Sequence, residues 1–192
     1  VTVAPLSIVY DGKEYVDQIE LTYEDVNDLL RENKVLKTSQ PNLGRINDIH
    51  ETHMSEGYDH IFVLSLSSHL SGTFSAFNQV KDLLEIPNMT IIDSQTLVGP
   101  IRQAVRKLNA WNEAGLSIEE MTAQLEEFFN HTSSFLYPEN LKQLKASGRI
   151  SGPAATLASL LKVKPLLYLE LHGTTIDKFG TGRTETKIFE MM

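Results

Sequence analysis

The chain has 192 residues, of which 41% are hydrophobic, and its formal net charge at pH 7 is −8. This hydrophobic content supports a packed core and argues against general disorder. The negative charge argues against a nucleic-acid-binding surface, which concentrates Lys and Arg. Because the chain has no cysteine, disulfide bridges and thiolate chemistry are excluded, and the composition fits a cytoplasmic protein.

We expect neither a membrane-spanning segment nor a signal peptide in this sequence. No apolar run approaches the ~20 residues that span a bilayer, so we expect no stable membrane insertion. The N-terminus lacks the basic region and cleavage pattern of a signal peptide. The chain opens as "VTVAPLSIVYDG" and stops in "RTETKIFEMM", which resembles the first turns of a helix. We therefore expect that both ends are cut.

The first segment predicts a hairpin and a helix. Two short runs with strand character flank Asp11-Gly12, a dipeptide that favours a two-residue hairpin turn. Thr22 then precedes a helical pattern over 23–32. Asp25 follows Thr22 by three residues, which is an acidic variant of the capping box.

A turn, a strand and further helices follow. We expect "TSQP" (38–41) to be a polar turn, and the helix after it to end at Gly57. The run "HIFVLSLSS" (60–68) is typical of a buried parallel strand. The next predicted helix covers 72–84. Its core-directed face is formed by Phe74, Phe77, Val80 and Leu84.

The next elements continue an alternation of strands and helices. "NMTIIDS" (88–94) predicts a strand, and 98–113 predicts a helix that ends at Gly115. Ser117 caps a further helix, because Glu120 follows it by three residues. This alternation predicts an α/β fold with a mostly parallel sheet and flanking helices.

The pattern changes after Asn130. "PENLKQLKASGRIS" predicts a helix with a glycine stop, "GPAATLASLLKV" an apolar helix, and "KPLLYLELHGTTIDKFG" an antiparallel hairpin. We therefore predict an N-terminal α/β domain over residues 1–130. Residues 131–192 form the beginning of a second, incomplete α/β domain with antiparallel strands.

The stretch "LSLSSHLSGTFSAF" (64–77) gathers hydroxyl side chains at a predicted helix start. The free N–H groups of a helix N-terminus favour an anion, and Ser67, Ser68, Ser71 and Thr73 add hydroxyl donors. A helix cap formed by Ser71 alone is the simpler interpretation. Four hydroxyls in seven residues exceed what a cap requires, which favours ligand binding.

A serine hydrolase acting on acyl esters through Ser71 or Ser68 is the alternative. Such a serine needs a base, an orienting acid and an oxyanion hole. His69 lies only two residues from Ser71, and such close neighbours rarely reach triad geometry. No G-x-S-x-G elbow is present. The residues favour ligand binding over hydrolysis, and a plain interaction module remains a third hypothesis.

Neither a nucleotide cofactor nor a metal is expected. The glycine motifs that cradle phosphates are absent. His50, His53 and His60 lie close together, but "HETH" places the first two only three residues apart, which differs from H-E-x-x-H. Because the surrounding stretch is polar, we interpret these histidines as solvated surface residues.

Two glycine turns carry an arginine, in "ASGRIS" (146–151) and "GTGRTETK" (180–187). Either arginine can bind an anion bidentately, and the usual role of such a residue is a weak surface ion pair. Like "TSQP", these turns are uninformative about function when each is taken alone.

Taken in order, these segments resemble the DegV family of bacterial lipid-binding proteins. Each is weak singly, but the ordered set spans nearly the whole chain and is specific. The segments are "APLSIVYDG", "TSQP", "SSHLSGT", "IIDS", "LKQLKASGRIS", "LLKVKPLLYLELHGTT" and "GRTETK". The resemblance implies a two-domain α/β protein that buries a long-chain fatty acid in a tunnel between its domains.

The resemblance also implies a carrier without catalytic residues of its own. The best-understood members are the acyl-carrying subunit of bacterial fatty acid kinase. They present the fatty acid carboxylate to a separate ATP-using kinase subunit, which makes acyl phosphate for phospholipid metabolism. For this chain we expect a cytoplasmic monomer with a fatty acid as its ligand and no cofactor.

The family's carboxylate-binding residues have counterparts in this chain. Hydroxyls of the T-[ST]-Q-P turn correspond to Ser39, with Thr38, and those of the S-G-T loop to Ser71, with Ser68. A basic residue of the R-T motif, near the head group or at the kinase-docking surface, corresponds to Arg183. The family's first strand and a head-group histidine of the second domain have no counterpart within the sequence.

A fatty acid also needs a long apolar cavity. Burying each CH₂ contributes ~0.8 kcal/mol, so a tail of about 16 carbons supplies most of the affinity. Ordinary core packing explains the candidate wall residues equally well. These candidates are Phe74, Phe77, Leu157, Leu160, Leu161 and Leu167.

Overall fold

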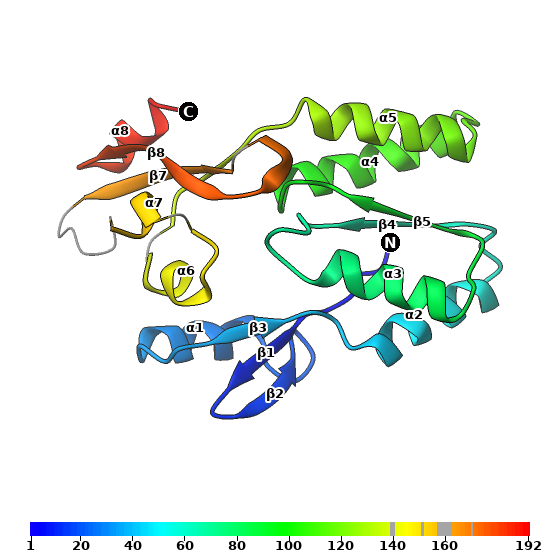
Figure 1. Cartoon of the computed structure of the whole chain (residues 1–192), viewed down its shortest axis with the longest axis horizontal. Helices are drawn as coiled ribbons and strands as arrows, with labels where there is room; N and C mark the ends of the chain where they lie inside the picture. The colour runs from blue at the N-terminus through cyan, green and yellow to red at the C-terminus, as the bar shows by residue number, and fades with distance from the viewer. Residues whose placement is uncertain (139–140, 151, 157–162, 170) are drawn as a thin grey trace. The chain divides into compact units, whose positions relative to one another are not determined.

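The computed structural model describes residues 1–138, 141–150, 152–156, 163–169 and 171–192 (Figure 1). Within them the chain forms two compact units. Unit 1 comprises Val1–Val63 and Ser71–Ile91, and unit 2 comprises Leu64–Leu70 and Ile92–Met192. The limits of these units differ from the domain boundary placed at residue 130, which stays a prediction.

A three-stranded antiparallel sheet of order β2-β1-β3 opens unit 1. Its strands are β1 (Ser7–Tyr10), β2 (Lys13–Val16) and β3 (Lys37–Ser39). Asp11 and Gly12 have φ values of 50° and 72°, the positive values that a two-residue hairpin turn requires. The predicted hairpin is therefore confirmed.

The predicted polar turn at Thr38–Pro41 is wrong for its first two residues. Thr38 and Ser39 belong to β3, which pairs with the edge of β1 that β2 leaves open. An isolated hairpin is only marginally stable, and a third strand satisfies the backbone groups of that edge. The residue before a proline also favours extended backbone, which suits the chain near Gln40.

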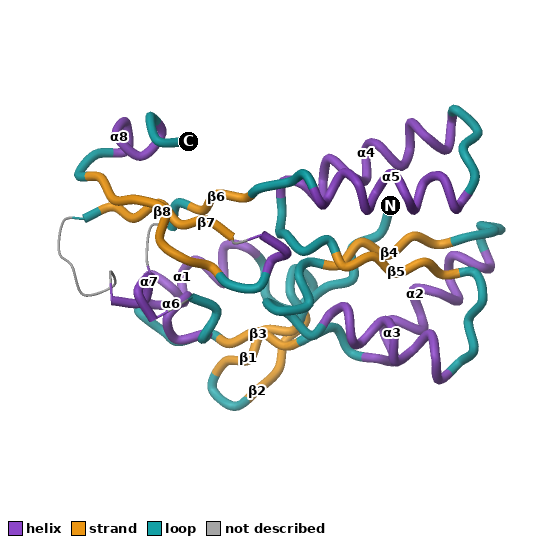
Figure 2. The backbone as a smooth tube through the Cα atoms, turned by 45° about the horizontal axis from the view of Figure 1, so that its top comes forward, coloured by secondary structure: helices purple, strands orange, loops and turns teal. Residues whose placement is uncertain are grey.

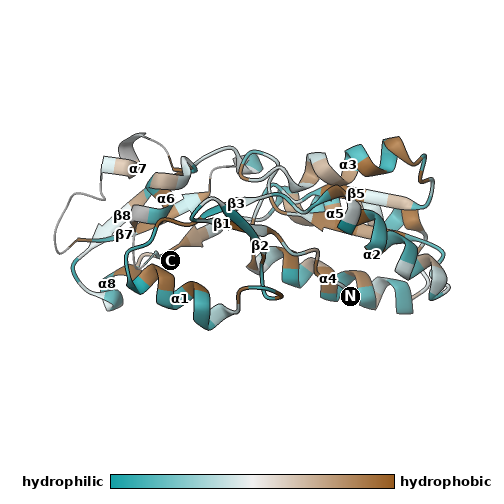
Figure 3. Cartoon of the chain, turned by 90° about the horizontal axis from the view of Figure 1, so that it is seen from below, coloured by the Kyte–Doolittle hydropathy of each residue, from teal (hydrophilic) through white to brown (hydrophobic). Residues whose placement is uncertain are grey.

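Three helices accompany this sheet in unit 1: α1 (Tyr23–Arg31), α2 (Leu43–Ser55) and α3 (Thr73–Leu83). The capping box predicted for α1 is present, because Thr22 and Asp25 exchange side-chain and backbone hydrogen bonds. Figure 3 shows apolar and polar residues side by side along α1. The amphipathic pattern therefore corresponds to a helix, as predicted.

The core of unit 1 lies between α2 and α3, which are in contact (Figure 2). The buried residues of this core are Ile46, Ala76, Phe77, Val80, Ile86 and Met89. Phe77 and Val80 face it as predicted. Leu84 does not, because it is the C-cap residue just beyond the last turn and is 47% exposed.

The strands β4 (Ile61–Ser65) and β5 (Met89–Asp93) form a second sheet. The Ile61 amide donates to the Asn88 carbonyl, and the Ser94 amide donates to the Ser65 carbonyl. Partners advance in the same direction along both strands, so this pair is parallel. The mostly parallel sheet predicted for the first domain is thus limited to this pair, beside the antiparallel sheet of β1 to β3.

Unit 2 contains an antiparallel pair of helices, α4 (Gly99–Glu113) and α5 (Ile118–Asn130), which lie side by side in Figure 1. Gly115 separates them with a φ of 78°. Ser117 and Glu120 form the predicted capping box at the start of α5. On α5 the buried residues are Met121, Leu125 and Phe129.

The rest of unit 2 is an antiparallel sheet of order β6-β7-β8 with short helices. The predicted hairpin of β7 and β8 is confirmed. The strands are β6 (Ser134–Leu136), β7 (Lys164–Leu169) and β8 (Ile176–Gly182). The helices are α6 (Leu141–Ser147), α7 (Gly152–Thr156), the 3₁₀ turn η2 (Leu171–Gly173) and α8 (Glu185–Phe189).

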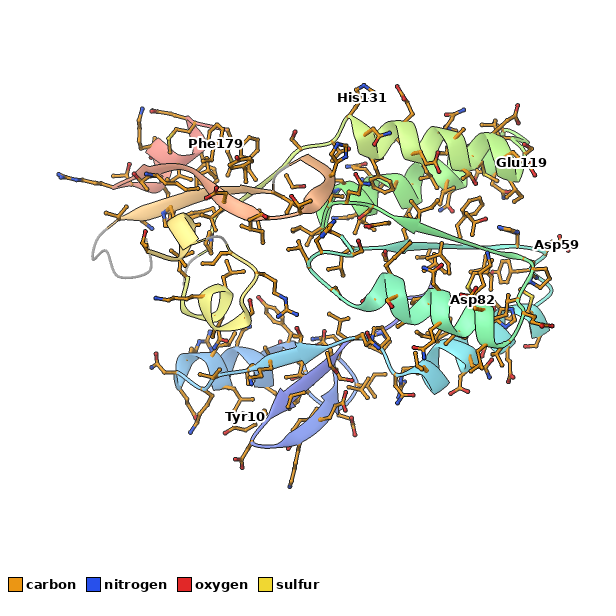
Figure 4. All side chains as sticks on the ribbon, viewed as in Figure 1. Tyr10, Asp59, Asp82, Glu119, His131 and Phe179 are labelled. Atoms are coloured by element: carbon orange, nitrogen blue, oxygen red, sulfur yellow. The ribbon has the colours of Figure 1, made fainter. Side chains whose placement is uncertain are left out.

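One face of this sheet packs into a core formed by Leu70, Leu141, Ala154, Leu167, Leu169 and Ile176. The other face carries an aromatic row, in which Phe179 contacts Phe135 and Tyr168 with ring centroids 4.8 Å and 6.1 Å apart (Figure 4). The predicted apolar helix over 152–163 is described as far as Thr156, and the candidates Leu157, Leu160 and Leu161 lie outside the described residues. None of the helices described is both long and apolar enough to cross a membrane.

A buried serine fastens the β7–β8 connection to the end of β4. The Ser67 hydroxyl donates to the Gly173 carbonyl over 2.6 Å, and Ser67 is fully buried. Gly173 has a φ of 66°, and a Cβ there would overlap the Gln95 carbonyl oxygen and lie 2.7 Å from Ser67 Oγ. Only a glycine at position 173 leaves room for this close contact with Gln95 and Ser67.

We predict that Gly173→Ala destabilises the protein far more than Gly148→Ala. Gly148 has a similar φ of 72° but open space around its Cα, so its substitution costs only backbone strain of about 1 kcal/mol. Gly173→Ala adds a clash with backbone and should cost about 1–3 kcal/mol more. Urea unfolding of both variants measures the difference, and equal midpoints would contradict the predicted clash.

Candidate functional site

The hydroxyls of Thr38 and Ser39 lie on opposite faces of the β2-β1-β3 sheet. Ser39 pairs with Ser7, and Thr38 pairs with Ile8. Successive side chains of a strand point to opposite faces, so a ligand on one face meets only one of the two hydroxyls. Ser39 is half-buried, whereas Thr38 is exposed.

Ser39 is engaged by a carboxylate of its own unit. Its hydroxyl donates to Glu14 Oε1 over 2.8 Å. The pairing of Val9 with Glu14, and of Ser7 with Ser39, puts Ser7, Glu14 and Ser39 on the same face. The pKa of the exposed Glu14 carboxyl is lowered, first by the Ser7 hydroxyl and then by the Ser39 hydroxyl. Two hydroxyls from two strands thus converge on one carboxylate.

The S-G-T loop places Ser71 just before α3. Gly72 is the N-cap residue, and no described side chain makes the usual capping bond to this helix. The Ser71 hydroxyl instead lies 2.9 Å from the Thr73 hydroxyl and accepts from the Thr73 amide over 3.3 Å. Ser71 therefore tightens the loop but does not cap α3 in the usual way, and amides of the first turn stay available to an anion.

Gln40 brings the two segments of unit 1 together. A Cβ added at Gly72 would overlap Gln40 Oε1 and would lie 3.3 Å from its Cδ. The Gln40 side chain therefore lies directly against the backbone at the start of α3. The residue after Ser39 and the residue after Ser71 are thus neighbours in space.

A shallow depression of about 380 Å³ lies on the same face as Glu14. Its lining is Pro5, Ser7, Glu14, Val16, Asn42, Gly44, Arg45 and Asp48. The lining combines the charged groups of Glu14, Asp48 and Arg45 with the apolar side chains of Pro5 and Val16, so it differs from the predominantly apolar cavity that a lipid tail requires.

Ser68 and Arg183 belong to unit 2. The Ser68 amide donates to Asp93 Oδ1 over 3.1 Å, and the Ser68 side chain is exposed. Arg183 is exposed in the short connection between β8 and α8. Ser67, next to Ser68, is fully buried and its hydroxyl has the structural role described above.

The histidines singled out by the sequence are half-buried, which corrects their interpretation as solvated residues. His53 Nδ1 lies 2.9 Å from Glu56 Oε2, and its ring meets Tyr58 edge-on. His60 Nε2 lies 2.8 Å from the Thr90 hydroxyl. Among the described residues no group of three or more His, Cys, Asp or Glu side chains is arranged to hold a metal.

Sequence reasoning missed Glu14, Ser7 and Gln40. Glu14 and Ser39 are 25 residues apart, and only the strand register brings them together. The alternation of the hairpin strands would have placed Glu14 and Ser7 on one face. The pairing of β3, which completes the set, had no local signal.

Comparison with known proteins gives a consistent match. A DegV family model matches residues 1–192. A DegV domain-containing protein of Streptococcus pneumoniae is 31% identical over 188 residues, which are 96% of this chain and 66% of the relative. A Clostridium acetobutylicum homologue is 32% identical over 171 residues, 88% of this chain and 61% of its own length.

Solved structures agree with this match. The structure described as fatty acid binding of a DegV family protein from Thermus thermophilus has 29% identity and a TM-score of 0.82, over 98% of this chain and 66% of the other. That of DegV, a fatty acid binding protein from Bacillus subtilis, has 27% identity and a TM-score of 0.77, over 97% and 66%. These likenesses confirm the predicted fold class. The chain spans about two thirds or less of the length of these relatives.

We predict that Gly72→Ala displaces the Gln40 side chain with little loss of stability. Gly72 has a negative φ of −73°, and the overlapping atom is the end of a flexible side chain, so the loss should stay below about 1 kcal/mol. The side-chain amide resonances of Gln40 should shift in an NMR spectrum. Gly99→Ala, whose Cβ meets open space, is the control and should leave them unchanged.

We also predict that Ser39→Ala raises the pKa of Glu14 toward its ordinary value. A lowered pKa in the folded state contributes stability that is present above the ordinary pKa and is lost as the pH falls through the lowered pKa. The variant should lose part of that pH-dependent contribution. Carboxyl-carbon NMR titration measures the shift, and Ser55→Ala, on α2, is the control. An unchanged Glu14 pKa would contradict the hydrogen bond.

Proposed function

The chain belongs to the DegV family, and from that premise we propose that it binds a long-chain fatty acid by its carboxylate. In this proposal the fatty acid lies in a tunnel between the two domains and a separate kinase subunit phosphorylates the carboxylate. Relatives of known structure, from Thermus thermophilus and Bacillus subtilis, are described as fatty acid binding, which supports the ligand class. The observation that carries the proposal is the contact of Gln40 with Gly72, which joins the two segments expected to hold the carboxylate.

The proposed head-group site uses neutral donors. The hydroxyls of Ser39 and Ser71, together with free amides at the start of α3, can donate to carboxylate oxygens. A carboxylate bound this way is hydrogen-bonded and is not buried as an unpaired charge. Thr38, Ser68 and Arg183 are further candidates, and their part in the site stays a proposal.

The apolar tail supplies most of the affinity in this proposal, at ~0.8 kcal/mol for each buried CH₂. Among the suggested wall residues, Phe77 and Leu167 are buried in the cores of unit 1 and unit 2, so ordinary packing accounts for them. Phe74 is half-buried on α3 and remains a candidate for contact with a tail.

The chain acts as a carrier in this proposal, and the chemistry belongs to its partner. A carboxylate oxygen of the bound fatty acid attacks the γ-phosphoryl group of ATP, which the kinase subunit holds, and acyl phosphate and ADP result. Since ATP is the phosphoryl donor, we place this reaction in the cytoplasm. The Ser71 hydroxyl has the Thr73 hydroxyl and amide as its described partners, an arrangement that does not activate a nucleophile.

We predict that the full-length protein purified from a bacterial host carries a fatty acid of about 14 to 18 carbons, long enough for the tail to dominate binding. Mass spectrometry of the denatured protein measures it. Ser71→Ala and Ser39→Ala should each weaken fatty acid binding about tenfold, the order expected when a hydrogen bond to a charged group is lost. Ser75→Ala, at an exposed position of α3, is the matched control and should bind normally.

Two results would overturn this proposal. One is the absence of any co-purified lipid together with no uptake of fatty acid by the purified protein. The other is labelling of the protein by a fluorophosphonate probe that is lost in Ser71→Ala, because it would identify Ser71 as a nucleophile and favour a hydrolase.

A further inference from the structure

The proposed head-group serine already holds a carboxylate, that of Glu14. Ser39 on β3 donates to Glu14 Oε1 over 2.8 Å, and Ser7 on β1, on the same face, also lowers the pKa of this carboxyl. Glu14 lies on β2, so three neighbouring strands contribute to one hydrogen-bonded set. In this set a serine hydroxyl holds a carboxylate, which is the same interaction that we propose for the carboxylate of the ligand.

One hydroxyl cannot serve both carboxylates fully. A serine hydroxyl has a single proton to donate, and its oxygen otherwise offers only lone pairs. While Ser39 donates to Glu14, a second carboxylate beside it would meet those lone pairs and a negative charge. Two carboxylates that share a site repel each other.

We propose that Glu14 is an internal competitor for Ser39, which a ligand carboxylate must displace before it binds there. This inference rests on the proposed function, because it concerns the same head-group site. Displacement is sterically easy: Glu14 is exposed, and β2 is an edge strand of its sheet. A glutamate side chain also has enough rotatable bonds to turn to solvent while β2 stays paired.

Glu14 therefore sets how tightly the head group is held without contacting the tail. Its removal should strengthen the binding of a carboxylate and leave a ligand without that charge unaffected. A purely structural glutamate, which only links β2 to β3, would give no such distinction between ligands. The charge of the ligand head group is thus the variable that separates the two roles.

The test compares palmitic acid with hexadecanol, which has the same tail length but no charge. Glu14→Gln and Glu14→Ala should bind palmitic acid about threefold to tenfold more tightly than the unmodified protein. This is the order of the repulsion between two unit charges about 4 Å apart in surroundings like water. Both variants should bind hexadecanol with unchanged affinity. Glu24→Gln removes the same charge from α1 and is the matched control.

A double variant tests whether the gain in affinity for palmitic acid depends on Ser39. In the Ser39→Ala background the shared hydroxyl is gone and only the repulsion between the two carboxylates remains, so Glu14→Gln should increase the affinity for palmitic acid less than it does with Ser39 present. If Ser39→Ala weakens palmitic acid binding while Glu14→Gln and Glu14→Ala leave it unchanged or weaken it, the competition proposal fails and the proposed function stands. If neither the unmodified protein nor any of the variants binds palmitic acid, the competition proposal and the proposed function both fail. Equal gains for palmitic acid and hexadecanol would also overturn the competition.

Discussion

The pairing of β3 with the open edge of β1 is the constraint on which the candidate site depends. The register that opposes Ser39 to Ser7 decides which hydroxyl shares a face with Glu14. A slip by one residue would exchange the faces of Thr38 and Ser39 and remove Ser39 from the carboxylate. The same pairing carries the chain to Gln40, so that this side chain reaches the start of α3. One short edge strand therefore positions both halves of the site in unit 1.

The hydroxyl-rich stretch around residues 64–77 has two separate roles. Ser65 and Ser67 are buried, and their hydroxyls donate to backbone carbonyls of Ile92 and Gly173. Polar groups so deeply buried are costly unless they are hydrogen-bonded, and these two are satisfied by the backbone. Ser71 and Thr73 lie beyond this set, at the helix start. Ser65 and Ser67 thus hold the fold together, whereas Ser68, Ser71 and Ser75 are exposed or half-buried and accessible to a ligand.

The parts of the fold that the sequence predicts well are those with local causes. Asp11-Gly12 specifies its hairpin turn, and the capping boxes at Thr22 and Ser117 specify where two helices begin. These devices act within four residues and need no partner from elsewhere in the chain. The pairing of β3 depends on an open strand edge formed about 30 residues earlier, and no residue type within 37–39 announces it. Composition alone made that segment resemble a turn.

The residues of the candidate site also differ in how far the sequence alone predicts them. The hydroxyl cluster at a predicted helix start already singled out Ser71, whereas Ser39 was found only because its motif resembles a family pattern, which contains long-range information that periodicity lacks. Glu14 belongs to no such pattern, and its position beside Ser39 follows from two strand registers acting together. A residue that competes with a ligand is also chemically similar to that ligand. Sequence reasoning that looks for groups complementary to a carboxylate, such as hydroxyls and arginines, therefore passes over a glutamate.

A weakly held head group is compatible with the proposed role of a carrier. Burial of the tail, at ~0.8 kcal/mol for each CH₂, provides enough affinity to retain the fatty acid without a tight head-group site. Binding that stabilises the ground-state carboxylate as strongly as the transition state does nothing to speed its phosphorylation. When Ser39 is shared between Glu14 and the ligand, the bound carboxylate is less stabilised by hydrogen bonding. Its oxygens are then more available to attack the phosphoryl group. The internal carboxylate would then serve the transfer step by keeping the ligand reactive, while the tail keeps it bound.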